Sequence, residues 1–152
     1  MLLFYNKTTY FIIVLYFYLK VVIKMKIGEL EKFRAEKPSV SLLREKYPFL
    51  SDLLRGEFRD KPNVYQFEQG TVVSWELDQA LRKNPTYGRI PIGHFEFPVD
   101  HTEEVTVLEG ILDAEFFGER RTIKNEMFVV PAGNLLKLDV KKAPVFYFCR
   151  YL

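Results

Sequence analysis

The chain has 152 residues, which is the size of one domain. Hydrophobic residues make up 48% of it and charged residues 28%, so it can bury a core, and wholesale disorder is excluded. The single cysteine, Cys149, excludes an intrachain disulfide and a cysteine-built zinc site, and it favours a reducing compartment, the cytoplasm. The formal net charge is only +2 and no run of lysine and arginine appears, so we expect no nucleic acid partner.

Residues 1–24 differ in composition from the rest of the chain. They contain three lysines and no acidic residue, and without them 19 basic residues face 20 acidic ones, a net charge of −1. Their unbroken apolar run covers only residues 10–19, short of the roughly 20 residues that cross a bilayer, and no small-residue cleavage site follows. We expect translated upstream sequence before a start at Met25. A membrane anchor and a packed N-terminal segment remain alternatives.

Residues 25–60 have a helical pattern and are predicted to form an extension before the main domain. Apolar residues recur at helical spacing in a first run, which ends at Pro38. Ser41 is the predicted N-cap of a second helical stretch that continues to residue 56, and Pro48 should kink or split it. The pattern predicts a helical hairpin that covers one face or edge of the main domain.

Residues 61–152 have a different sequence pattern, in which short runs rich in β-forming residues are separated by turn residues. The intervals leave no room for crossover helices, which excludes a parallel sheet. The fold class is therefore all-β, and we predict a small antiparallel β-barrel of jelly-roll type. The predicted strands are 64–67, 71–77, 89–97, 104–108, 111–117, 120–124, 127–130, 135–140 and 145–151.

A spaced set of glycines, one glutamate and one proline carries a first resemblance. Gly93, Glu103 and Gly110, followed by Pro131 and Gly133, resemble the two half-motifs of the cupin superfamily. The resemblance implies a single cupin barrel whose mouth holds the functional site.

The metal-binding histidines of the common cupin motif are missing. Their positions fall on Val99 or Pro98 and on Leu136, and the chain contains only His94 and His101. A conventional cupin metal site cannot be assembled from two histidines, so we expect no metal and interpret both as structural or turn residues.

Three segments carry a narrower resemblance. Residues 102–110, 128–133 and above all the terminal Tyr147-Phe-Cys-Arg-Tyr-Leu152 resemble the pyrimidine/purine nucleoside phosphorylase family, small metal-free cupins of bacteria. The similarity covers about residues 88–152. It implies phosphorolysis of purine and pyrimidine nucleosides by a cytoplasmic homodimer, with no cofactor and with inorganic phosphate as the co-substrate.

The resemblance also implies roles for individual residues. Glu103 would hold ribose hydroxyls or stabilise developing positive charge. Arg150 would bind phosphate through bidentate hydrogen bonds. Aromatic residues of the last strand would stack on the base. The implied catalytic residues are Glu103 and Arg150, and the implied substrate-binding residues are Glu104, Tyr147, Phe148 and Tyr151.

Strand alternation limits this set. Tyr147 and Tyr151 fall on one face of the predicted strand, whereas Phe148 and Arg150 fall on the other, so both pairs cannot line one cavity. Cys149 is interpreted as a small buried apolar residue. Glu103 as an exposed carboxylate and Arg150 as a surface ion pair at a dimer contact are the alternatives. At the level of function, a non-catalytic cupin that binds a small molecule or a protein, and a sugar-modifying cupin, also remain open.

Overall fold

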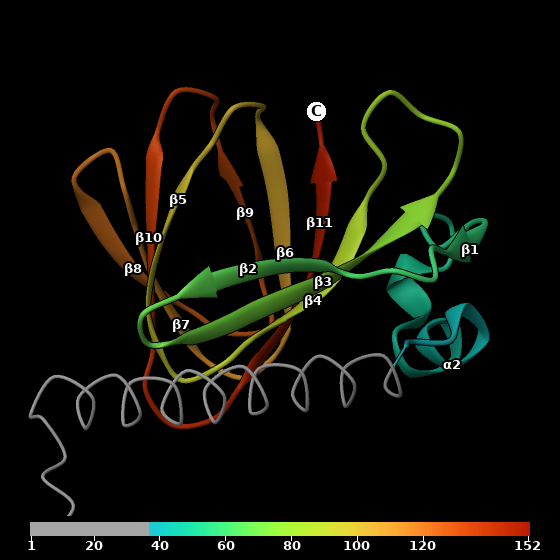
Figure 1. Cartoon of the computed structure of the whole chain (residues 1–152), viewed down its shortest axis with the longest axis horizontal. Coiled ribbons are helices and arrows are strands. Elements are labelled where there is room, and N and C mark those ends of the chain that lie inside the picture. Colours follow the sequence, from blue (N-terminus) through green and yellow to red (C-terminus); the bar gives the residue numbers. More distant parts are fainter. Residues whose placement is uncertain (1–36) are drawn as a thin grey trace, which may run out of the picture. The chain divides into compact units, whose positions relative to one another are not determined.

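The computed structural model describes residues 37–152, which form one compact unit. Two antiparallel β-sheets face each other, and a short helical segment lies at one side (Figure 1). The elements are α2 (Val40–Lys46), the 3-10 helix η1 (Pro48–Leu50), β1 (Glu57–Phe58), β2 (Asn63–Phe67), β3 (Gly70–Asp78), β4 (Thr86–Ile90), β5 (Gly93–Pro98), β6 (Glu103–Glu109), β7 (Leu112–Phe116), β8 (Glu119–Ile123), β9 (Met127–Val130), β10 (Leu135–Val140) and β11 (Val145–Tyr151).

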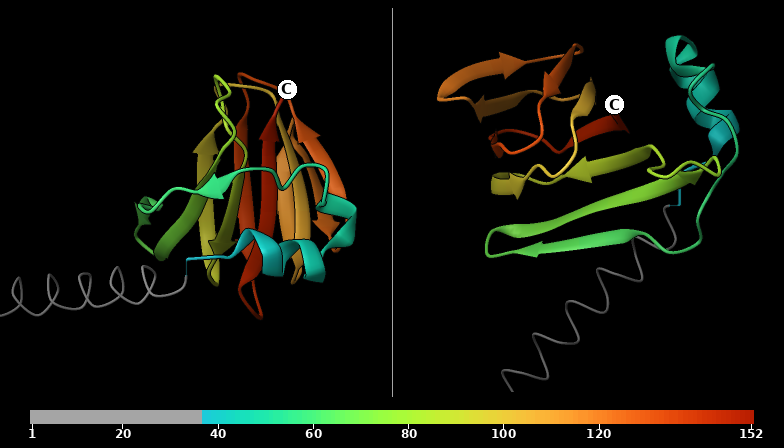
Figure 2. Two further views of the ribbon diagram at one scale, coloured as in Figure 1. Left: turned by 90° about the vertical axis from the view of Figure 1, so that its right-hand side faces the viewer. Right: turned by 90° about the horizontal axis from the view of Figure 1, so that it is seen from above.

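The strands cross repeatedly between the two layers. The larger sheet has the order β1-β3-β4-β11-β6-β9, with β2 also paired to β3, and the smaller sheet has the order β5-β10-β7-β8. The view from above separates these layers (Figure 2). Hydrogen bonding does not close them into a continuous barrel, but the all-β cupin class predicted from the sequence is confirmed.

The hydrophobic core lies between the sheets, and alternate residues of each strand supply it. Leu136, Leu138 and Val140 of β10 face Val105 and Val107 of β6 across the gap, and all five side chains are buried. Phe95 of β5 is fully buried among them. Burial of this kind stabilises a domain by about 25 cal/mol for each Å² of apolar surface removed from water.

The helical segment covers the outer face of the larger sheet, in front of β11 and β6 (Figure 2, left). Its buried leucines, Leu43, Leu50 and Leu54, supply apolar contact area. The Tyr47 hydroxyl donates a hydrogen bond to Glu109 at the end of β6. The described part of the extension thus packs on the larger sheet, whereas the predicted helical hairpin as a whole stays a prediction because its first half lies outside the described residues.

The helix boundaries correct two details of the sequence prediction. Ser39, not Ser41, is the N-cap of α2, and its hydroxyl accepts a hydrogen bond from the Leu42 backbone N–H. Pro48 splits the stretch, as expected, but α2 is only seven residues long. The residue before a proline avoids helical geometry, and Tyr47 has φ −126° and ψ 71°. The helix predicted before Pro38 lies almost entirely outside the described residues.

Two strand predictions were also wrong. The single strand predicted over residues 89–97 is divided, because Pro91 has no N–H to donate to a ladder and the chain turns there into the other sheet. The short β1, which pairs with the end of β3, was missed because it is only two residues long. No helix within residues 37–152 has the length and apolar character needed to span a bilayer.

Candidate functional site

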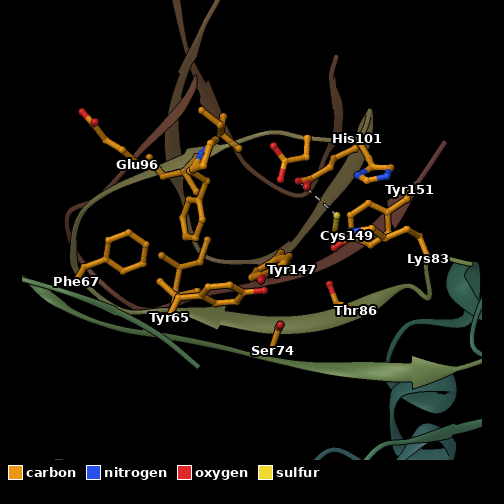
Figure 3. Close-up of a pocket in the computed structure, with 18 residues that line it drawn as sticks. Tyr65, Phe67, Ser74, Lys83, Thr86, Glu96, His101, Tyr147, Cys149 and Tyr151 are labelled. Atoms are coloured by element: carbon orange, nitrogen blue, oxygen red, sulfur yellow. Dashed lines mark hydrogen bonds between the residues drawn. The ribbon is translucent and has the colours of Figure 1, made fainter. Parts of the chain in front are cut away.

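A cavity of about 440 Å³ lies between the two sheets. This volume falls within the ~300–1,000 Å³ usual for small-molecule sites. Strands from both sheets and the turns beside them line it (Figure 3). The lining residues are Tyr65, Phe67, Val72, Ser74, Lys83, Thr86, Ile90, Glu96, Phe97, Pro98, Asp100, His101, Glu103, Leu136, Leu138, Tyr147, Cys149 and Tyr151.

One end of the cavity is aromatic. Tyr65 and Phe67 project from β2, and the Phe97 ring on β5 meets both edge to face, with centroid distances of 6.0 and 5.0 Å. Figure 3 shows Tyr65 and Phe67 together at this side of the cavity. We call these three side chains the aromatic end. Flat, apolar walls of this kind bind planar rings by stacking and edge contacts.

The floor of the cavity is shaped by Tyr147 of β11. Its ring lies over Gly88, its partner on β4, so closely that a Cβ there would come within 2.5 Å of the phenol oxygen. Glycine at position 88 is therefore what makes room for the ring. Beyond Gly88 comes Ser74, its register partner on β3. Burial raises the pKa of the Tyr147 phenol well above its usual value, and a hydrogen bond with Ser74 opposes the shift.

The other end of the cavity is charged, and we define it by Lys83, His101 and Glu103. Burial raises the pKa of the Glu103 carboxyl, whereas a long hydrogen bond of 3.8 Å from the Cys149 thiol and the positive charge of Lys83 lower it. Figure 3 shows Lys83 and His101 grouped around Tyr151, opposite the aromatic end. A half-buried carboxylate and a lysine ammonium thus line the same end of the cavity.

The C-terminus is fixed at this charged end. Tyr151 pairs with Glu103 in the β11–β6 ladder, and the Leu152 backbone N–H donates to the Thr102 carbonyl at 2.9 Å. The Lys83 ammonium lies 5.0 Å from the centre of the Tyr151 ring. The last strand therefore contributes directly to the site.

Three of the six site residues predicted from the sequence line the cavity together: Glu103, Tyr147 and Tyr151. Each comes from β6 or β11, and all three point between the sheets because they occupy alternate positions of their strands. Cys149 shares this face and is buried, with a pKa raised well above the usual thiol value by burial.

The other three predicted residues lie on the opposite face of the same strands. The Arg150 guanidinium binds Glu104 in a bidentate pair, with N–O distances of 2.5 and 3.0 Å. Phe148 is buried on that outer side. None of the three lines the cavity, so this cavity brings together Glu103, Tyr147 and Tyr151 but not Arg150. Tyr147 and Tyr151 thus lie on one face of β11 and Phe148 and Arg150 on the other, as the alternation of side chains along a strand predicts.

Sequence reasoning missed Lys83, Tyr65 and Ser74, and it interpreted His101 as a structural or turn residue. Lys83 belongs to a polar stretch between β3 and β4 that resembles any surface turn, so its composition gave no signal. Tyr65 and Ser74 lie on predicted strands, and period-2 alternation could have assigned them to one face, though not to a cavity.

His94 takes no part in the cavity. Its ring nitrogens lie 2.7 Å from Asp139 and 3.3 Å from Glu96 on the surface, and these carboxylates raise its pKa. Within residues 37–152, no three histidine, cysteine or acidic side chains gather closely enough to hold a metal ion. Metal independence remains a prediction.

The fold and the cavity together define an all-β cupin of two sheets with an internal small-molecule pocket. The chain belongs to the pyrimidine/purine nucleoside phosphorylase family, whose model matches residues 61–151. The resemblance first seen in the motif around Glu103 and in the C-terminal strand is thereby confirmed.

Solved structures of similar fold come mostly from proteins of unknown function. A protein of unknown function from Vibrio parahaemolyticus is 26% identical in sequence to this chain. The structural alignment covers 60% of this chain and 99% of the Vibrio chain, with a TM-score of 0.52. A protein of unknown function (DUF1255) from Acinetobacter sp. ADP1 is 19% identical. Its structural alignment covers 62% of this chain and 92% of the Acinetobacter chain, with a TM-score of 0.53. No curated protein matches the chain.

Proposed function

We propose that this protein is a nucleoside phosphorylase acting on purine or pyrimidine nucleosides. A phosphate oxygen forms a bond to the anomeric carbon while the bond from that carbon to the base nitrogen breaks. The base leaves with the bonding electron pair and takes the proton that hydrogen phosphate carried. The products are the free base and a pentose 1-phosphate, and no covalent enzyme intermediate is required.

The observation that carries the proposal is that Glu103 lines one cavity together with an aromatic wall and a lysine. The transition state of this reaction has oxocarbenium character, so a carboxylate directed into a pocket stabilises the charge that develops on the sugar. The same oxygens accept hydrogen bonds from ribose hydroxyls. Family membership and the half-buried Glu103 support the same chemistry independently.

The two ends of the cavity suit the two ends of a nucleoside. The aromatic end offers Tyr65, Phe67 and Phe97 to a planar base. It presents no array of hydrogen-bond donors and acceptors that would select one base, which fits broad base specificity. The ribose then lies toward Glu103.

The test is base release from uridine and from adenosine by the full chain, with and without inorganic phosphate. We expect free base and pentose 1-phosphate in equal amounts, and only when phosphate is present. Release without phosphate would indicate a hydrolase. Binding of a nucleoside with no release under any condition would favour the non-catalytic small-molecule-binding cupin.

Three accompanying properties belong to the proposal: metal independence, a homodimer and a cytoplasmic location. Elemental analysis of the purified protein, together with activity in the presence of a chelator, tests the first. Sedimentation of the active protein tests the second. Stoichiometric metal whose removal abolishes activity would contradict the proposal of a metal-free enzyme.

A further inference from the structure

The placement of Arg150 leaves the proposed reaction without its expected phosphate ligand. Its guanidinium is neutralised by Glu104 on the outer face, away from the cavity. An anionic nucleophile needs a cation or a cluster of donors close to the sugar. The cavity must therefore supply a different group.

Lys83 is the only lysine or arginine among the described residues that line the cavity. Its ammonium forms no salt bridge within residues 37–152, so its charge is not neutralised by direct pairing. It lies over the Tyr151 ring, with His101 at the same end. The other charged lining groups are carboxylates: Glu96, Asp100 and Glu103.

These carboxylates restrict where an anion can sit. The three carboxylates repel phosphate, and among the described lining residues only Lys83 is a lysine or arginine that attracts it. Lys83 is also on the Glu103 side of the cavity, because it lies over the ring of Tyr151, the register partner of Glu103 in the β11–β6 ladder. An anion held there is next to the sugar that Glu103 would bind.

The backbone around Lys83 is held in place by its neighbour Asn84, which is 6% exposed. The Asn84 side-chain oxygen accepts hydrogen bonds from the backbone N–H groups of Gln79 and Leu81, at 3.0 and 3.1 Å. Its amide nitrogen donates to Glu76 on β3 at 2.8 Å. Hydrogen bonds of a buried side chain to its own loop fix that loop in one conformation, so the base of the Lys83 side chain has a defined position.

We propose that Lys83, at the charged end of the cavity, binds the inorganic phosphate of the reaction, with His101 as a second donor. This inference rests on the proposed phosphorylase function. It assigns the phosphate site to the turn between β3 and β4 instead of the C-terminal strand. Phosphate bound there is placed to attack the sugar from the side opposite the aromatic end.

The experiment compares Lys83→Met with Lys83→Arg and with the matched control Arg82→Met. Arg82 precedes Lys83 in the same turn but does not line the cavity. Initial rates of base release are measured against phosphate concentration at saturating nucleoside. We expect Lys83→Met to raise the phosphate KM about 10- to 100-fold, as loss of a charge-assisted contact does, while the nucleoside KM changes far less.

Lys83→Arg should recover part of the phosphate affinity, and Arg82→Met should match the wild type. Equal phosphate KM values for Lys83→Met and Arg82→Met would overturn the inference. Calorimetric titration with inorganic phosphate alone gives a readout that needs no turnover. Binding by the wild type that is lost in Lys83→Met supports the site even if no nucleoside is cleaved, and absence of binding by the wild type refutes it.

Discussion

The two faces of the last strand, β11, present opposite chemistry. On the inner face, Tyr147, Cys149 and Tyr151 line the cavity beside Glu103 of β6. On the outer face, Arg150 binds Glu104, the residue next to Glu103 in the chain. The same short sequence motifs supply the residues of both faces, because successive side chains of a strand point to opposite sides of the sheet.

This difference shows that a motif shared by a family mixes two kinds of residue. The inner set has perturbed environments: burial raises the pKa of Glu103, Tyr147 and Cys149. The outer pair is a partly exposed ion pair whose charges cancel. Residues with perturbed pKa values in a cleft are the better candidates for chemistry.

The largest expected contrast lies between the adjacent glutamates. Glu103→Gln removes the negative charge directed into the cavity, and we expect kcat/KM for nucleoside to fall roughly 10²- to 10³-fold. Glu104→Gln changes a carboxylate that binds Arg150 outside the cavity, and its effect should be below about tenfold. Steady-state kinetics on both variants measure the contrast. A larger loss of kcat/KM in Glu104→Gln than in Glu103→Gln would contradict the assignment of the site to the inner face.

The inner face should also be sensitive to the space above Gly88. Gly88→Ala would bring a Cβ into the Tyr147 ring, and we expect the free energy of unfolding to fall by about 1–3 kcal/mol. The nucleoside KM should rise, because the displaced ring intrudes on the cavity.

Denaturant unfolding with a double-mutant cycle tests the cause. In a Tyr147→Ala background, Gly88→Ala should cost much less. Equal costs in both backgrounds would show that the glycine acts through something other than the ring.

The outer ion pair should contribute little to phosphate binding. Arg150→Met is expected to lower the free energy of unfolding by about 1–3 kcal/mol, because it leaves the Glu104 carboxylate, whose side chain is only 14% exposed, without its partner. We expect the phosphate KM to change less than about threefold, because the guanidinium does not line the cavity. Denaturant unfolding and phosphate titration give the two values. If Arg150→Met raised the phosphate KM as strongly as Lys83→Met does, Arg150 would have to be counted among the phosphate ligands.

The smallest effect concerns the pH profile. The Cys149 thiol donates to Glu103 and lowers its pKa against the dominant effect of burial. Cys149→Ala removes this donor, so the pKa of Glu103 should rise, and the loss of kcat/KM on the acidic side should begin at higher pH. The pH dependence of kcat/KM for both proteins tests this. An acidic limb that stays in place, or moves to lower pH, would contradict it.

The all-β class, most strand positions and the family could be predicted from the amino-acid sequence. The predicted strands 127–130, 135–140 and 145–151 match β9, β10 and β11 in full, because alternation and turn residues are local signals. Alternation alone also separated Tyr147 and Tyr151 from Phe148 and Arg150. The division at Pro91 was missed because two strands of similar composition run almost into each other.

Two features required the three-dimensional structure: which face of β11 lines a cavity, and which cationic side chain lies at that cavity. Both faces of β11 are largely covered, the inner by the opposite sheet and the outer beneath the helical segment, so hydrophobicity alone does not distinguish them. Lys83 reaches the cavity because the turn fixed by Asn84 carries it beside Tyr151, which lies far along the chain in the last strand. Such proximity arises from the pairing of distant strands, and no local pattern of residues encodes it.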